Sequence, residues 1–257
     1  MNNEKHIVEI IIPVYKTALS EFEQISLQQV YKVLNNYPLV VIKPDSLDLS
    51  VLAEQYPLLT IKSFDDHYFK SIHGYNALML SKQFYAEFLH TQYILVYQLD
   101  AYVFRDELRY WCDKDYDYIG APWLKRPIYN LPVISNIMKF SRWNHHRKNL
   151  IDKQDLYDKI GNGGFSLRKV ERFYNIIVEQ QIRINFFLEK RDHLHNEDVF
   201  WASVSGFNYP NVQEAIAFAF DKYPSLCYKL NKKRLPFGCH GWYKRKMKSF
   251  WKSIIDF

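Results

Sequence analysis

The sequence has few cysteines, few glycines and no long hydrophobic run. Its three cysteines are scattered through 257 residues without a CxxC pair, which excludes a disulfide framework and a cysteine-rich zinc site and favours a reducing compartment. The first apolar run, residues 7–14, is interrupted by Glu9 and Pro13. No stretch reaches the roughly 18 apolar residues that a membrane-spanning helix needs. We therefore expect a cytoplasmic protein.

Several familiar catalytic motifs are also absent. The sequence contains no Walker A loop and no GxGxxG, which weakens the case for an ATPase or a dinucleotide-binding enzyme. It contains no HExxH and no GxSxG, which weakens the case for a metalloprotease or an esterase. With 48% hydrophobic residues, 8 glycines and 10 prolines, the composition is that of a globular domain rather than a disordered or collagen-like chain.

Aromatic residues and positive charge are plentiful. Tyr, Phe and Trp make up 17% of the chain, and 34 Lys and Arg against 28 Asp and Glu give a net charge of +6. Aromatic rings suit deep cores and also surfaces that stack against sugars and bases, while the charge favours an anionic partner. A nucleic-acid binder is one alternative, but no recognised nucleic-acid motif is present, so we expect no nucleic-acid partner.

The N-terminal part of the chain follows a β-α-β pattern. Residues 7–14 form a nearly continuous β-branched run, which is typical of a strand buried on both faces. A helix is expected over residues 20–34, with Ser20 as its N-cap and Glu23 as the capping-box partner. Short strands are expected at 38–42 and 58–61. This alternation predicts a mainly parallel sheet covered by helices.

The remainder continues this pattern without an internal repeat or a Ser/Gly linker. The expected elements are a helix over 71–90, a strand over 93–97, a short strand within 116–123, a glycine-rich loop over 161–168, and helices over 169–181 and from 195 to 202. We therefore expect one α/β domain over residues 1–242, with a mixed, mainly parallel, Rossmann-type sheet flanked by helices.

Four segments are candidates for chemistry. Asp100 follows the strand at 93–97, where open α/β sheets place functional groups and where a carboxylate can hold a divalent cation. Glycines over 161–164 allow close approach of a ligand. Glu197 and Asp198 are adjacent carboxylates, one of which can act as a general base, and His240 can supply an imidazole. Each segment also has a purely structural interpretation, as a turn, a helix cap or an exposed loop.

Two basic segments stand out from the rest of the chain. Residues 124–160 combine Lys, Arg and two adjacent histidines with aromatics, and they predict a partly helical insertion. An acceptor-facing lid is one role for it, and a purely structural role is the alternative. The tail at 243–257 is basic and aromatic, a composition found in segments that lie on an anionic membrane surface. A C-terminal helix packed into the core is the alternative for this tail.

In combination and in this order, the motifs are far more specific than any one alone. They are Y-N-x-L-M-L-S at 75–81, Y-Q-L-D-A at 97–101, D-Y-I-G-A-P-W at 117–123, G-N-G-G-F-S-L-R at 161–168, N-E-D-x-F-W at 196–201 and F-G-x-H-G-W at 237–242. The chain resembles an uncharacterised bacterial domain family described as glycosyltransferase-like, from about Ile7 to Trp242. More distantly, it is similar to glycosyltransferases of the GT-A fold.

The GT-A resemblance implies a donor site. It places Pro13, Val14 and Tyr15 near the nucleotide, and it puts Asp100 in the position of a metal-binding D-x-D motif, followed here by Ala101. The motif then reads Asp-Ala-Tyr, so one of its two carboxylates is missing. The implied cofactor is Mn²⁺ or Mg²⁺, held by Asp100 and His240.

The same resemblance implies a catalytic centre. Gly163 and Gly164 would line the junction of donor and acceptor, and Arg168 would help to hold the nucleotide sugar. Glu197 or Asp198 would be the catalytic base. Lys244 and Arg245 are further candidates for the positive charge that a departing diphosphate needs.

These observations predict a nucleotide-sugar-dependent, hexosyltransferase-like enzyme. The expected reaction transfers a sugar to a hydroxyl group of a glycan or lipid-linked acceptor in bacterial surface polysaccharide synthesis, at the inner face of the cytoplasmic membrane. The Glu-Asp pair implies an inverting reaction, and retention stays an open alternative. A second alternative is a non-catalytic nucleotide- or carbohydrate-binding protein with the same fold.

Overall fold

The computed structural model describes residues 6–148 and 150–257. Within these residues, a six-stranded sheet has the order β3-β2-β1-β4-β7-β6, and a three-stranded sheet has the order β5-β9-β8. The large sheet contains β1 (His6–Pro13), β2 (Leu39–Pro44), β3 (Leu59–Phe64), β4 (Thr91–Tyr97), β6 (Tyr118–Gly120) and β7 (Phe165–Lys169). The small sheet contains β5 (Ala101–Val103), β8 (Ala219–Phe220) and β9 (Gly238–His240).

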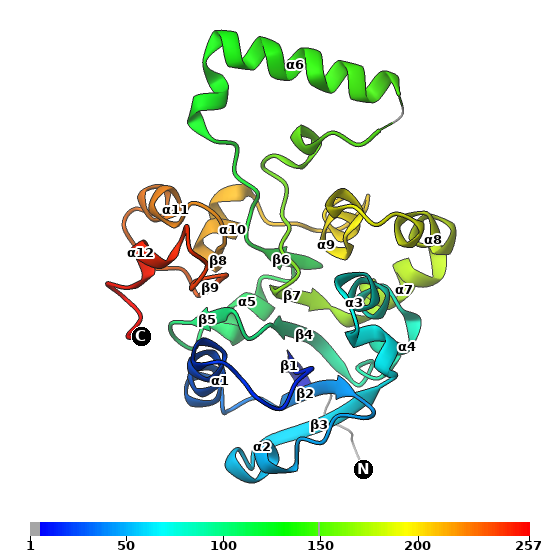
Figure 1. The fold of residues 1–257 in the computed structure, drawn as a ribbon, viewed down its shortest axis with the longest axis vertical. Helices are drawn as coiled ribbons and strands as arrows, with labels where there is room; N and C mark the ends of the chain where they lie inside the picture. The colour runs from blue at the N-terminus through cyan, green and yellow to red at the C-terminus, as the bar shows by residue number, and fades with distance from the viewer. Residues whose placement is uncertain (1–5, 149) are drawn as a thin grey trace.

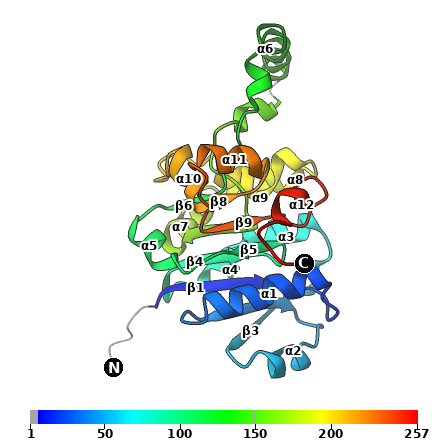
Figure 2. The same ribbon diagram turned by 90° about the vertical axis from the view of Figure 1, so that its left-hand side faces the viewer.

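Helices cover both faces of the large sheet (Figures 1 and 2). They are α1 (Glu21–Val33), α2 (Ser50–Gln55), α3 (Ile72–Met79), α4 (Lys82–Ala86), α5 (Leu108–Asp113), α6 (Pro132–Arg147), α7 (Val170–Glu179), α8 (Gln181–Glu189), α9 (Glu197–Trp201), α10 (Val212–Phe218), α11 (Pro224–Leu230) and α12 (Lys248–Trp251). Short 3₁₀ turns are η1 (Asp66–Phe69), η2 (Pro127–Asn130), η3 (Lys153–Leu156) and η4 (His193–His195). The predicted α/β class is confirmed.

Strand β1 shows why the predicted buried strand forms. Ile10 and Ile12 belong to the core cluster on the α1 side of the sheet, and Ile11 belongs to the cluster on the opposite side. All three side chains are fully buried. Because successive side chains point to opposite faces of a strand, only a continuous apolar run can occupy this central position.

Helix α1 begins as the sequence predicts. The side-chain oxygen of Ser20 accepts from the backbone N–H of Glu23, and the Glu23 carboxylate accepts from the Ser20 backbone N–H at 2.8 Å. This reciprocal capping box satisfies two backbone donors that a helix otherwise leaves open. The first turn is thereby held next to the loop that follows β1.

Two predicted boundaries differ from the structure. The helix expected over 71–90 is two helices, α3 and α4, because Leu80 ends the first and the Ser81 hydroxyl caps the second by accepting from the Phe84 N–H. The expected loop over 161–168 contains strand β7, which pairs antiparallel with both β4 and β6. The other strand pairs of the large sheet are parallel, so the sheet is mixed and mainly parallel as predicted.

The C-terminal tail folds back onto the body. Trp251 and Ile255 are buried with Trp242 in a core cluster beside the small sheet. Burying a side chain of this size stabilises a fold by about 2–3 kcal/mol, so these apolar residues belong to the interior. Arg245, Lys246 and Lys252 of the tail are exposed. No helix among residues 6–148 and 150–257 is long and apolar enough to cross a membrane.

The segment between β6 and β7 leaves the body of the molecule. It carries η2, α6 and η3, and α6 stands well away from both sheets in two perpendicular views (Figures 1 and 2). None of the α6 residues is buried. The segment between β6 and β7 is therefore a projecting arm.

Candidate functional site

A cavity of about 710 Å³ opens where β1 and β4 end. Val14 and Tyr15, which follow β1, line one part of it, and Gln98 and Asp100, which follow β4, line another. Strand β1 has β2 on one side and β4 on the other, so the chain order reverses at this point. In open α/β sheets such a switch point leaves a crevice at the carboxyl ends of the strands, and ligands bind there.

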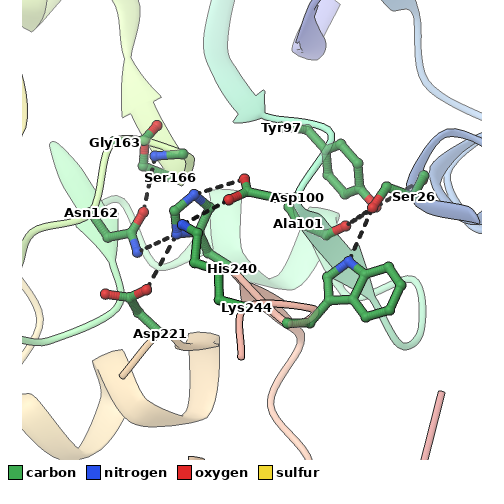
Figure 3. A network of polar contacts seen from close by, with 12 residues as sticks. Ser26, Tyr97, Asp100, Ala101, Asn162, Gly163, Ser166, Asp221, His240 and Lys244 are labelled. Atoms are coloured by element: carbon green, nitrogen blue, oxygen red, sulfur yellow. Dashed lines mark hydrogen bonds and ion pairs between the residues drawn. The ribbon is translucent and has the colours of Figure 1, made fainter. Parts of the chain in front are cut away.

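Asp100 lies at the centre of a polar cluster on the cavity wall (Figure 3). One of its carboxylate oxygens lies 2.9 Å from His240 Nε2, and the other lies 2.9 Å from Lys244 Nζ. The second ring nitrogen of His240 faces the Asn162 amide at 3.0 Å and the Asp221 carboxylate at 3.3 Å. A neutral Nδ1 accepts from Asn162, whereas a protonated Nδ1 donates to Asp221.

The charges in this cluster shift one another's ionisation. Burial acts to raise the pKa of Asp100, but His240 and Lys244 outweigh it and hold that pKa far below its ordinary value. Burial acts to lower the pKa of His240, but Asp100 and Asp221 raise it to about 9. With no other ligand present, the carboxylates are therefore compensated by an imidazolium and an ammonium group.

The cluster also fits a divalent cation that is shared with a substrate. His240 Nε2 is buried and makes no aligned hydrogen bond, although it lies 2.9 Å from Asp100. Two ligands of an octahedral ion at about 2.1 Å lie about 3 Å apart, and Asp221 is placed to orient the imidazole through Nδ1, as carboxylates do behind metal-binding histidines. Among the described residues, no group of three or more His, Cys, Asp or Glu forms a complete metal site. Phosphate or water oxygens would have to supply the remaining ligands.

The glycine-rich loop makes room for the functional side chains. A Cβ atom on Gly163 would lie 1.8 Å from a Glu197 carboxylate oxygen. A Cβ atom on Gly164 would lie 2.2 Å from His240 Nε2 and 2.7 Å from the Gln98 amide oxygen. Distances this short are sterically forbidden, so both positions need a residue without a side chain.

For the nucleotide-sugar reaction that the sequence predicts, we expect Gly164→Ala to lower kcat/KM about 100-fold, because a displacement of about 1 Å at an active site has this effect. The added methyl group must displace the His240 imidazole, whose Nε2 lies 2.9 Å from Asp100. Gly206→Asn is the matched control, since Gly206 has a positive φ that Asn tolerates and no neighbouring atom within 4 Å of a Cβ. Steady-state kinetics on both variants check this expectation, and an unchanged kcat/KM in Gly164→Ala contradicts it.

Glu197 is held by a buried ion pair. Its carboxylate lies 3.2 Å from Arg168, whose guanidinium is fully buried and also donates to Tyr85 and to the Gly163 carbonyl. Burial raises the pKa of Glu197, and Arg168 opposes that shift. The other Glu197 carboxylate oxygen has no hydrogen-bond partner among the described residues. This pairing makes Glu197 a fixed, compensated group rather than a free base.

Asp198 is in a different environment, although it is the next residue. One of its carboxylate oxygens accepts from the Val199 backbone N–H at 2.9 Å, and no cation is paired with it among the described residues. Burial first, and then repulsion from Glu197 and Asp221, raise its pKa to about 7. A carboxylate with a pKa near the working pH is suited to accept and release a proton.

A second cavity of about 200 Å³ adjoins the first. Trp123, Asn196, Asp198 and Lys222 line both cavities, so Asp198 lies at their junction. The second cavity is also lined by Tyr129, Lys153, Leu156, Tyr157 and Tyr223. Several of these belong to the base of the insertion, and the rings of Tyr129 and Tyr157 stack at a centroid distance of 5.9 Å. Aromatic side chains of this kind bind the apolar faces of sugars.

Most of the predicted site residues line the large cavity. They are Pro13, Val14, Tyr15, Asp100, Gly163, Gly164, Glu197, Asp198, His240 and Lys244. Ala101 lies in the core instead, where its carbonyl accepts from Ser26 and Tyr97. Arg168 is behind the cavity wall, and Arg245 does not line the cavity.

The spacing of the acidic motif differs from the prediction. Tyr102 packs against Phe104 and Trp242, away from the cavity, whereas Gln98 lines the cavity together with Asp100. The residue two positions before Asp100, rather than two after it, therefore shares its surroundings. That position carries an amide in place of a carboxylate.

Four charged cavity residues are absent from the sequence-based predictions. They are Lys16, Lys70, Asp221 and Lys222. Lys16 pairs with the capping-box residue Glu23 at 2.7 Å. Asp221 and Lys222 follow β8, which has only two residues, so no periodic pattern in the sequence identifies that strand end. The cavity therefore has several cations suited to an anionic ligand, namely Lys16, Lys70, Lys222, His240 and Lys244.

The comparisons with known proteins were made on sequence and on structure. A family model described as "Protein of unknown function (DUF5672)" matches residues 58–240. No curated protein sequence matches the chain. Many solved structures are similar to this chain.

Three of these solved structures are glycosyltransferases or glycan synthases. The galactosyltransferase LgtC, solved with donor and acceptor sugar analogs, has 10% identity and a TM-score of 0.56, with 95% of this chain and 94% of that chain covered. GlyE of Streptococcus pneumoniae TIGR4 has 10% identity and a TM-score of 0.54, with 97% and 61% covered. Core-mannan synthase A of Aspergillus fumigatus, in its Mn/GDP form, has 12% identity and a TM-score of 0.50, with 77% and 70% covered. This likeness shows the fold, which is GT-A-like as predicted.

Proposed function

We propose that this chain, which belongs to the DUF5672 family, is a glycosyltransferase that moves a sugar from a nucleotide-sugar donor to a hydroxyl group of a glycan or lipid-linked acceptor. The observation that carries the proposal is the position of Asp198. It lies where a large cavity that carries both lysine and acidic side chains meets a smaller cavity lined by aromatic side chains. In this arrangement the donor binds in the large cavity, the acceptor binds in the smaller cavity, and Asp198 acts as the base between them.

The large cavity is proposed to bind the donor. Lys16, Lys70 and Lys244 line it, and positive charge is what a nucleoside diphosphate requires. Val14 and Tyr15 offer apolar and aromatic surface for the nucleotide base at the end of β1. The solved relatives bound to donor and acceptor sugar analogs or to Mn and GDP support a donor of this class.

Asp100 and His240 are the residues that would hold a divalent cation, Mn²⁺ or Mg²⁺. When bound, the cation neutralises charge on the diphosphate leaving group. Asp221 orients the His240 ring, and Lys244 adds a fixed positive charge beside Asp100. Side chains of the protein therefore also compensate the negative charge that develops on the departing diphosphate.

Asp198 is proposed to act as the base. Its carboxylate accepts the proton of the acceptor hydroxyl as that oxygen bonds to the anomeric carbon, and the bond from this carbon to the diphosphate breaks with the electron pair going to the phosphate oxygen. Such a single displacement inverts the anomeric configuration. NMR of the product tests this step, and a retained configuration would remove the base role from Asp198 while leaving the transferase proposal intact.

The smaller cavity is proposed to bind the acceptor. Tyr129, Tyr157 and Tyr223 line it together with Trp123, and the first two belong to the insertion expected to act as a lid. A glycan or lipid-linked acceptor of bacterial surface polysaccharide synthesis, presented at the inner face of the cytoplasmic membrane, fits this location. The donor sugar is expected to be a hexose.

A binding protein without catalysis is the second candidate. The observation in its favour is Gln98, which puts an amide where a second carboxylate would complete the acidic motif next to Asp100. Such a protein would bind nucleotide sugars without releasing nucleotide, and Asp198→Asn would not alter its behaviour.

Incubation with a panel of UDP-, GDP- and CMP-sugars and an acceptor extract, with and without Mn²⁺, tests the transferase proposal. We expect one donor to release its nucleotide, and we expect Asp198→Asn to slow that release about 1,000-fold. Binding of a donor without any release from folded protein would support the second candidate instead.

A further inference from the structure

Helix α6 is held in a fixed orientation by one of its faces. Arg142 pairs with Asp155 at 2.7 Å, and His146 meets the same carboxylate at 2.8 Å. The Gln154 side chain donates to the Met138 carbonyl at 2.7 Å, so this face is tied to η3. The contacts between α6 and η3 settle which side of the helix points outward from the arm.

The opposite face of α6 is apolar and uncovered. Val133, Ile137, Phe140 and Trp143 are 72%, 64%, 68% and 52% exposed. Their spacing of four, three and three residues places them along one side of a helix. Side chains this apolar are normally buried, and no other part of the described chain covers them. The face therefore needs a partner outside the chain.

The charged side chains of α6 itself, and of the residues that lead into it, are all basic. Residues 124–151 contain six Lys and Arg and no Asp or Glu. Lys139, Arg147 and Lys148 are exposed on α6 or at its end, and the Arg147 guanidinium lies 4.7 Å from the centre of the Trp143 ring. Arg142 is the member of this set that a carboxylate neutralises. An anionic partner matches this charge.

We propose that the outer face of α6, formed by Val133, Ile137, Phe140 and Trp143, docks on an anionic lipid surface. A helix with Trp and Phe on one side and Lys and Arg around them lies in the plane of a membrane interface, with its apolar side chains among the acyl chains and its cations at the headgroups. The helix stands clear of the body (Figures 1 and 2), so a flat surface can reach it.

A lipid surface fits this ridge better than a protein groove does. Four side chains of a single helix are fewer than the roughly 20–30 residues that each partner contributes to a stable complex. The membrane contact expected for the C-terminal tail is less suited to the structure, because Trp251 and Ile255 are buried in the core. In the tail, basic side chains remain exposed without a matching apolar face.

Docking through α6 has a consequence for the acceptor. Tyr129 and Tyr157, near the base of the same arm, line the smaller cavity. A lipid-linked acceptor would then approach this cavity from the surface on which the arm lies. This consequence rests on the proposed function, whereas the docking itself does not.

Vesicle flotation with the full chain and no nucleotide tests the docking. We expect binding to phosphatidylcholine vesicles that contain phosphatidylglycerol, and little binding to vesicles of phosphatidylcholine alone. Phe140→Ser combined with Trp143→Ser should weaken binding at least about tenfold, because it removes two large apolar groups from the interface. Both residues are exposed, so the melting temperature of this variant should equal that of the wild type.

The tail provides a matched control for charge. Lys139→Gln with Lys148→Gln and Lys246→Gln with Lys252→Gln remove the same charge from exposed positions of α6 and of the tail. We expect the α6 pair to lower vesicle binding and the tail pair to leave it nearly unchanged. Equal losses from the two pairs, or full binding by the Phe140 and Trp143 variant, overturn the proposal. Absence of vesicle binding by a wild type that sediments as a dimer would assign the face to a second copy of the chain instead.

Discussion

Asp198→Asn is expected to lower kcat about 1,000-fold while the protein becomes more stable at alkaline pH. The rate falls because Asn cannot accept the acceptor's proton, and general-base catalysis contributes about 10²–10⁴ in rate. Donor binding should be retained, since the diphosphate is held by other residues of the cavity. Nucleotide release and donor affinity, measured on wild type and variant, check the two parts separately.

The gain in stability follows from the raised pKa. Burial first, and then repulsion from Glu197 and Asp221 against the attraction of Arg168, raise the pKa of the Asp198 carboxyl to about 7 in the folded protein from an ordinary value of 3.8. The carboxyl therefore destabilises the fold increasingly as the pH rises from about 4 to about 7, and the destabilisation stays constant at higher pH. Asn removes it, so we expect a gain on the order of 4 kcal/mol at pH 8 and almost none near pH 4.

The same pKa predicts the pH profile of the wild type. Because the base must be ionised, kcat should rise as the pH increases through about 7. Chemical denaturation at the two pH values and a kcat profile provide the measurements. A variant with wild-type kcat would show that Asp198 is not the base, and equal stability at pH 8 would show that its carboxylate is not destabilised by burial.

Arg168→Met is expected to destabilise the protein by about 3–5 kcal/mol, because it leaves the Glu197 carboxylate buried without its cation. Arg168 has no exposed surface, and it also donates to Tyr85 at 2.9 Å. Met fills much of the same volume without a charge, so the lost ion pair dominates the change. Urea denaturation monitored by circular dichroism gives the free energy of unfolding.

A double variant separates the ion pair from simple packing. Arg168→Met with Glu197→Gln removes both charges, and we expect it to be clearly more stable than Arg168→Met alone. If the free energy of unfolding of Arg168→Met lies within 1 kcal/mol of the wild-type value, the ion pair does not hold Glu197. If the double variant is no better than the single one, the destabilisation comes from packing around Tyr85 rather than from the unpaired carboxylate.

Local patterns in the sequence predict the N-terminal half of the fold well. Ile10, Ile11 and Ile12 are continuous because both faces of β1 are buried, and Ser20 and Glu23 predict the start of α1 through contacts three residues apart. The direction of β7 is not predictable in this way. Its antiparallel pairing depends on β4 and β6, which are distant in sequence, and the pattern over 165–169 is the same for either direction.

The candidate site is also predicted only in part by local sequence patterns. Asp100, His240 and the Glu197-Asp198 pair are brought to one cavity, as expected from strand ends and helix starts. Gln98 and Tyr102 flank Asp100 symmetrically in the sequence, and only the packing of Tyr102 against Trp242 shows which of them leaves the cavity. The fixed role of Glu197 depends on the distant residue Arg168, a pairing that no local pattern contains.

The most direct test of the donor site is a crystal structure of the protein with a nucleoside diphosphate and Mn²⁺. We expect the metal ion on Asp100 and His240, the diphosphate beside the metal ion and Lys244, and the base against Val14 and Tyr15. A nucleotide bound elsewhere, with the contacts of Asp100 to His240 and Lys244 unchanged, would contradict the assignment of the large cavity to the donor.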